Sequence, residues 1–90
     1  MYIVGIEEPR VFEFELDGET YRVPSVASMS IDKAREYAEA SKKDGFSFAL
    51  WVLDNLFPED ARQAVASLSV SQLGALLGAY AQDAGVTLGE

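Results

Sequence analysis

Residues 11–24 read VFEFELDGETYRVP, and this pattern determines how the N-terminal part of the chain folds. Apolar and acidic residues alternate up to Asp17-Gly18, a dipeptide that suits a two-residue type I′ turn because both positions need positive φ. That turn places apolar pairs on one face and polar pairs on the other: Phe14 with Tyr21, Phe12 with Val23, Glu13 with Arg22, and Glu15 with Thr20. We therefore predict a hairpin over residues 11–23, with its apolar face covered, since an isolated hairpin is marginal in water.

Four short helices are expected after the hairpin, over residues 31–43, 46–57, 58–67 and 70–84, with residues 85–90 as a tail and Met1–Gly5 frayed. Their ends carry cap and breaker signals: Ser30 before the first, Asp44-Gly45 after it, Pro58 at the third, Ser69 with Gln72 at the fourth, and Gly85 after that. The prediction is a single α+β domain over residues 1–90, an N-terminal β-hairpin packed on a bundle of about four short helices.

The segment 46–57 is apolar nearly all round, which is typical of a helix at the centre of a core or of one covered by another chain. Trp51 and its neighbouring phenylalanines fit either reading, because aromatic side chains also anchor interfaces. Gly74 and Gly78, four residues apart, would let another helix approach closely, although local packing explains the same spacing.

The chain carries 15 acidic against 7 basic residues, a net charge of −8. Nucleic-acid binding is unfavourable for such a protein, because neutralisation of phosphates by basic residues supplies most of that affinity. The charge serves either solubility or attraction to a basic partner.

Neither cysteine nor histidine occurs in the sequence, so thiolate chemistry and the commonest general base and metal ligand are excluded. Glu7-Glu8 and Glu59-Asp60 are explained as turn and cap residues, and the glycines do not form a phosphate loop. We expect no catalytic, cofactor-binding or metal-binding residues, no cofactor, and a protein that is not an enzyme.

No basic n-region of a signal peptide precedes the first apolar residues. The longest apolar stretch, around 46–57, is shorter than the roughly 17–25 residues that cross a bilayer. We therefore expect no membrane association and a cytoplasmic location.

Three segments together resemble the tail assembly chaperones of long-tailed, siphovirus-type bacteriophages and prophages, particularly those of actinobacteria. FEFELDGETYRVP is similar to the family's opening F-x-F-x-L-D-G-x-x-Y-x-x-P, and Leu56-Phe57-Pro58-Glu59 is similar to its mid-chain helix break. The segment from Leu68 to Glu90 resembles the family's last helix and its G-V-x-x-G-E ending.

The resemblance implies a non-catalytic morphogenesis factor that binds the tape measure protein in the cytoplasm of the bacterial host and is absent from the mature virion. It also implies a longer product of a ribosomal frameshift, whose C-terminal extension recruits the major tail protein; homo-oligomerisation stays open. We expect the apolar faces around Trp51 and Leu73–Tyr80 to bind the partner or a second copy: Phe48, Trp51, Val52, Leu73, Leu76, Leu77 and Tyr80. The alternative is a generic acidic protein-interaction module, such as an antitoxin or a regulatory subunit.

Overall fold

The computed structural model describes residues 1–83, and its N-terminal hairpin has the predicted register. Strands β1 (Val11–Leu16) and β2 (Glu19–Pro24) are antiparallel, with Phe14 opposite Tyr21. Asp17 has φ 52° and Gly18 φ 80°, the positive values that a type I′ turn requires at both central residues. The hairpin prediction is therefore confirmed.

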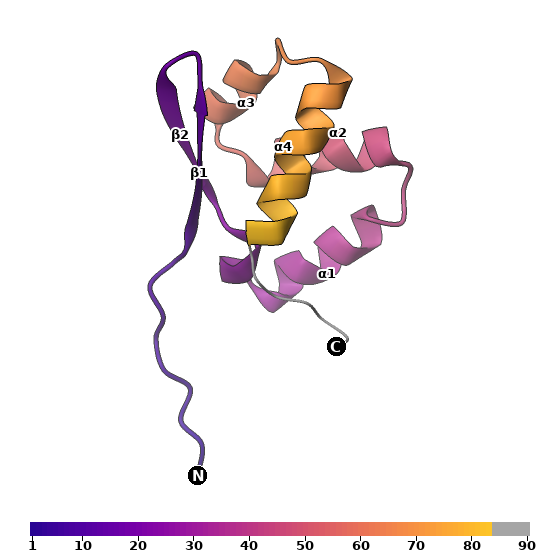
Figure 1. Ribbon diagram of the computed structural model, residues 1–90. Coiled ribbons are helices and arrows are strands. Elements are labelled where there is room, and N and C mark those ends of the chain that lie inside the picture. Colours follow the sequence, from indigo (N-terminus) through magenta and orange to yellow (C-terminus); the bar gives the residue numbers. More distant parts are fainter. Residues whose placement is uncertain (84–90) are drawn as a thin grey trace.

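A 3₁₀ turn η1 (Val26–Ser28) and four helices follow within the described range: α1 (Ile31–Ala40), α2 (Gly45–Leu56), α3 (Glu59–Val65) and α4 (Val70–Asp83). The predicted α+β class is confirmed. The hairpin stands along one side of the helices, and α4 crosses in front of α2 (Figure 1).

The core lies where the hairpin's apolar face meets α2, α3 and α4. Its buried members come from β2 and all three of these helices: Val23, Ala49, Val52, Leu53, Phe57, Ala61, Val65, Leu73 and Tyr80. Phe12 and Phe14 pack against this cluster from β1, and Phe12 meets the Tyr80 ring edge-on at a centroid distance of 5.4 Å. Covering the ribbon in this way supplies the support that two strands alone lack.

The first helix is shorter than predicted, and Asp44 belongs to the start of the second helix. The structure ends α1 at Ala40, so Lys42 and Lys43 lie in the turn between the helices and not in a last helical turn. Asp44 is the N-cap of α2: its carboxylate accepts hydrogen bonds from the Ser47 backbone N–H (2.9 Å) and the Ser47 hydroxyl (2.8 Å). The dipeptide Asp44-Gly45 therefore starts one helix, whereas the sequence pattern suggested only the end of another.

The other caps agree with their sequence signals. Ser30 accepts a hydrogen bond from the Lys33 N–H at the start of α1. Ser69 and Gln72 form the reciprocal bonds of a capping box, 3.1 and 2.9 Å long, before α4. Pro58, predicted as the first residue of a helix over 58–67, is instead the N-cap of α3, which spans Glu59–Val65. Gly85 and the predicted tail, 85–90, lie outside the described residues, as does the predicted last residue of the fourth helix.

Residues 1–10 have no helix or strand, and all are exposed. They extend away from the lower end of the hairpin (Figure 1). Of the helices found up to Asp83, none has the length and apolarity that a membrane span needs.

Candidate protein-interaction surfaces

The structure divides the seven predicted partner-binding residues into two groups. Val52, Leu73 and Tyr80 are 2%, 8% and 1% exposed, so these three side chains belong to the core and offer no surface to a partner. The other four are half-buried at the edge of the core: Phe48, Trp51, Leu76 and Leu77. Only this second group remains available for contact with another molecule.

Phe48 and Leu77 line an apolar groove between α1, α2 and α4, which we call the glycine groove. Its volume is about 260 Å³, and its walls are built mainly from small and aromatic residues: Tyr37, Gly45, Phe48, Ala49, Gly74, Leu77, Gly78 and Ala81. No charged residue is among these lining residues. The helical spacing of Gly74, Gly78 and Ala81 places them on one face of α4, so the groove runs along that helix.

Packing among the described residues does not require glycine at these positions. A Cβ atom built on Gly45, Gly74 or Gly78 meets no other atom within 4 Å. Glycine in a helix interior costs roughly 0.5–1 kcal/mol relative to alanine. Residues 1–83 therefore give no packing reason for glycine at positions 74 and 78, and the two glycines leave the groove floor at backbone level.

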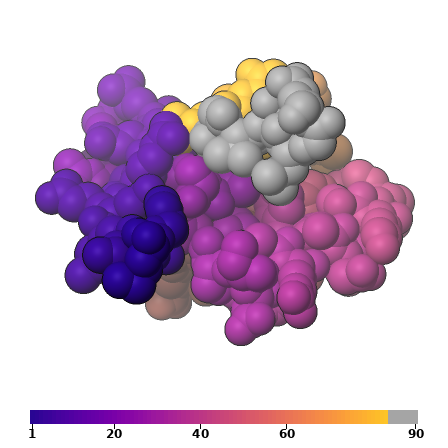
Figure 2. All heavy atoms as spheres, turned by 90° about the horizontal axis from the view of Figure 1, so that it is seen from below, coloured from indigo at the N-terminus to yellow at the C-terminus, as the bar shows by residue number. Residues whose placement is uncertain are grey.

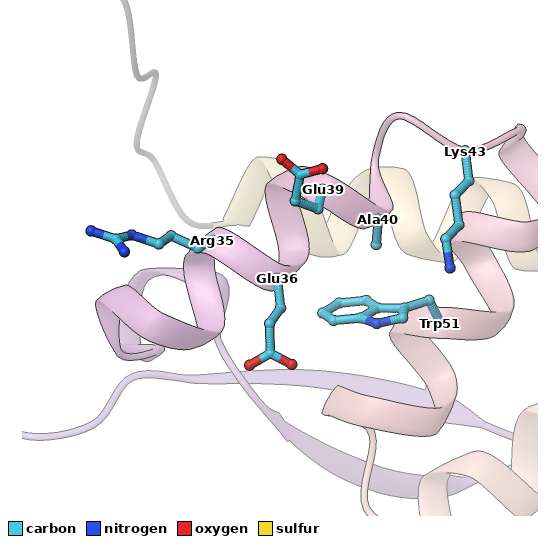
Figure 3. Close-up of a pocket in the computed structure, with 6 residues that line it drawn as sticks. All are labelled: Arg35, Glu36, Glu39, Ala40, Lys43 and Trp51. Carbon is cyan, nitrogen blue, oxygen red and sulfur yellow. The ribbon is translucent and has the colours of Figure 1, made fainter.

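Trp51 lies in a second, shallower depression on the other side of the α1–α2 contact, which we call the Trp51 hollow. It has a volume of about 450 Å³ and is lined by Arg35, Glu36, Glu39, Ala40, Lys43 and Trp51. In the close-up, Glu36 lies beside the indole while Arg35 points away from it (Figure 3). The Trp51 hollow is thus an indole surface bordered by charges of both signs.

The Tyr37 ring connects the two surfaces. It contacts Phe48 edge-on at a centroid distance of 5.2 Å and Trp51 at 6.2 Å. Tyr37 also lines the glycine groove, so a substitution at Trp51 would alter the packing of Tyr37 and with it one wall of that groove.

The acids of the Trp51 hollow are partly neutralised by one lysine on α1 and one in the turn after it. Glu39 pairs with Lys42 at 3.1 Å and Glu36 with Lys33 at 3.7 Å. Glu36, Glu39 and Lys42 are largely exposed and Lys33 is half-buried, so these pairs contribute little to stability. A ligand of a single charge sign gains little from such a border.

Several exposed apolar residues were not among the sequence candidates. Phe46 and Leu50 lie on the outer side of α2, Ile31 opens α1 and Val70 opens α4. Phe46 is 52% exposed, although the sequence pattern grouped it with Trp51 as part of the core or of a binding surface. The largest group of exposed apolar residues is at the N-terminus. The unbroken apolar run Tyr2-Ile3-Val4 is the sequence feature that could have indicated it.

Three titratable groups have shifted pKa values, and each shift has a structural cause. Burial raises the pKa of Tyr80 to about 12, and burial also raises that of Tyr37. Hydrogen bonds from Ser47 lower the pKa of Asp44. In residues 1–83 no three His, Cys, Asp or Glu side chains are grouped as metal ligands would be. These positions stabilise helices and the core, and none of them forms a pair of the kind that acid–base catalysis uses.

Neither a family model, nor a curated protein, nor a solved structure matches this chain. Function is therefore inferred from the two surfaces and from the sequence resemblance.

Proposed function

We propose that this protein is a tail assembly chaperone of a long-tailed bacteriophage or prophage, which binds the tape measure protein during tail morphogenesis and catalyses no reaction. The resemblance supports this proposal through the Phe12–Pro24 segment, the helix break at Leu56–Glu59 and the segment from Leu68 onward. The first of these segments forms the hairpin, and the second is the junction between α2 and α3.

The glycine groove is the observation that carries the proposal. Its length along α4, its lack of charged lining residues and its backbone-level floor suit the apolar face of an amphipathic helix. A tape measure protein is a very long helical chain whose apolar faces would associate if left uncovered. A small protein that covers such a face acts as a chaperone without chemistry.

The net charge supports the same function. A bound helix adds its outer polar face to a surface that already carries a net charge of −8. Mutual repulsion then keeps complexes apart while many copies coat one client. The expected location is the cytoplasm of the bacterial host, with no copy retained in the mature virion. The expected frameshift extension, which would recruit the major tail protein, begins beyond the described residues.

Co-expression with the tape measure protein of the same genome tests the proposal. In the variant Gly74→Leu/Gly78→Leu each new Cβ starts in open space, and the two side chains extend into the groove of about 260 Å³, so the variant should fold and should lose the client. The matched control, Ala75→Leu/Ala79→Leu, adds the same side chains on an exposed part of α4 that does not line the groove. We expect soluble complex with the native chain and the control, and insoluble client with the groove variant.

A client that stays soluble alone, or one that binds the groove variant as well as the control, would contradict the proposal. An antitoxin or a regulatory subunit remains the alternative function, since the same net charge attracts a basic partner. The two are separated by the neighbouring genes: a gene for a very long helical protein favours the chaperone, and a gene for a small basic toxin favours the alternative.

A further inference from the structure

Residues 1–6, the N-terminal arm, form an exposed apolar segment. Its inner side borders an open depression of about 590 Å³ that Met29, Ser30 and Ile31 also line, but this neighbourhood leaves the arm's apolar side chains in water. Met1, Tyr2, Ile3, Val4 and Ile6 are 76–113% exposed, and no side chain of the arm is charged. Seen from below, these residues stand at the front of the molecule (Figure 2). Tyr, Ile and Val favour β-strands, and the acids and proline of Glu7-Glu8-Pro9 are typical of residues that limit uncontrolled strand pairing.

The hairpin has an edge that could receive such a strand. Because the Ser25 N–H donates to the Arg10 carbonyl, the alternation of an antiparallel ladder points the N–H and C=O groups of Val11, Glu13 and Glu15 away from β2. Within residues 1–83 the sheet contains only β1 and β2, so no third strand pairs with these groups. The outer edge of β2 offers fewer hydrogen-bond donors to a third strand, because Pro24 lacks an N–H there.

The arm does not reach this edge in its own chain. Its base is held by Arg10, whose carbonyl accepts from Ser25 and whose Nη2 donates to the Asp83 carbonyl at 3.0 Å. From there the arm continues away from the hairpin instead of turning back along it (Figure 1). In this arrangement the arm leaves the outer edge of its own β1 open to a strand from another molecule.

We propose that the N-terminal arm adds as a third strand to the outer edge of β1 in a second copy of this chain, with the two copies exchanging arms to form a dimer. The arm and β1 (Val11–Leu16) have six residues each, so one arm covers one edge. When two copies related by a two-fold axis exchange arms, the outward N–H and C=O groups of β1 in both copies gain hydrogen-bond partners. The proposal is independent of the proposed chaperone function.

Charge favours the arm over a direct pairing of two hairpins. The solvent face of β1 carries Glu13 and Glu15, so two β1 edges side by side would bring four carboxylates together. An arm without acidic side chains on the same edge avoids this repulsion. It also buries side chains that are otherwise in water.

The oligomeric state of the full chain tests the exchange. We expect a dimer in sedimentation velocity and light scattering, and a dimer at least about tenfold weaker in Ile3→Pro/Val4→Pro, since two successive amide donors are removed and one of them lies in the ladder in either register. Val70→Ser is the control, because Val70 is an exposed apolar residue on α4 and does not border the arm, whereas Ile31 does. A monomeric native chain, or a dimer unaffected by the proline variant, would overturn the proposal.

Cysteine cross-linking locates the contact, because the chain has no native cysteine. Ile3→Cys and Val4→Cys are each mixed with Glu13→Cys on β1 or Arg22→Cys on β2. We expect a disulfide-linked heterodimer with Glu13→Cys from at least one arm position, and markedly less with Arg22→Cys. Equal yields with both, or none with Glu13→Cys, would show that the arm does not pair with β1 and would overturn the proposal.

Discussion

The Tyr80 hydroxyl on α4 donates a 2.6 Å hydrogen bond to the Pro24 carbonyl oxygen at the end of β2. The two residues are 56 positions apart in the sequence, and Tyr80 is almost wholly buried. Its ring also meets Phe12 and Phe57 edge-on, at 5.4 and 5.6 Å. One side chain therefore joins the last helix, the end of α2 and both strands of the hairpin.

Removing only this hydroxyl should destabilise the protein without changing its fold. In Tyr80→Phe the aromatic contacts stay while the Pro24 carbonyl loses its donor, which costs about 1–3 kcal/mol of the free energy of unfolding. Urea unfolding followed by circular dichroism measures the loss. Tyr37→Phe is the control, because its hydroxyl is not bonded to the hairpin. Equal losses in the two variants would contradict the role assigned to the Tyr80–Pro24 bond.

Alkaline pH should weaken the fold through the same residue. Burial raises the pKa of Tyr80 from 10.0 to about 12, so the folded state keeps the proton where the unfolded state has lost it. This contribution is fully present below pH 10 and is lost as the pH rises toward 12. We expect the free energy of unfolding to fall over that range, and to fall less in Tyr80→Phe. Parallel pH profiles of the two proteins would contradict this explanation.

The hairpin could be predicted in detail because its information is local. The alternation around Phe12 and Phe14 defines the two faces, and Asp17-Gly18 defines the turn, so the register follows without any knowledge of the helices. The Ser69–Gln72 capping box is equally local, and it was found for the same reason.

The buried side of each helix could not be predicted in the same way. Trp51 and Val52 are adjacent on α2, a helix that is apolar nearly all round, yet one is half-buried and the other belongs to the core. Which one turns inward depends on where α1 and α4 pack, and that is a tertiary property. Asp44 shows a second limit of prediction from sequence. A residue that follows one helix can equally be the N-cap of the next, and the local pattern does not distinguish the two roles.

Asp44 should make the stability of the protein sensitive to acid. Hydrogen bonds from the Ser47 N–H and hydroxyl hold the pKa of Asp44 below its ordinary value of 3.8. The stabilisation is therefore present above about pH 4 and is lost as the pH falls through the lowered pKa. Asp44→Asn keeps an efficient N-cap but cannot titrate. We expect similar stability to the native chain at pH 7 and a smaller loss on acidification, both measured by urea unfolding.

Gly78→Ala should stabilise the free protein. The added Cβ meets nothing within 4 Å, and alanine is favoured over glycine in a helix by roughly 0.5–1 kcal/mol. Thermal unfolding should show a higher midpoint. Gly18→Ala is the opposing control, since Gly18 has φ +80° and a side chain there is strained. A destabilised Gly78→Ala protein would mean that the groove closes on Gly78 in the free state, and the docking proposal would lose its main support.

Trp51→Ala should weaken client binding more than it weakens folding. The indole is half-buried, so its removal should cost less than the roughly 3–5 kcal/mol typical of a fully buried Phe or Trp. It supports the Tyr37 ring that lines the glycine groove, so the groove loses part of one wall. Co-purification with the tape measure protein and urea unfolding, both on the same variant, separate the two effects. Leu50→Ala, a neighbouring exposed position on α2, is the control. Collapse of the fold in Trp51→Ala would instead assign the indole to the core, and the contact surface would then be confined to α4 and the groove floor.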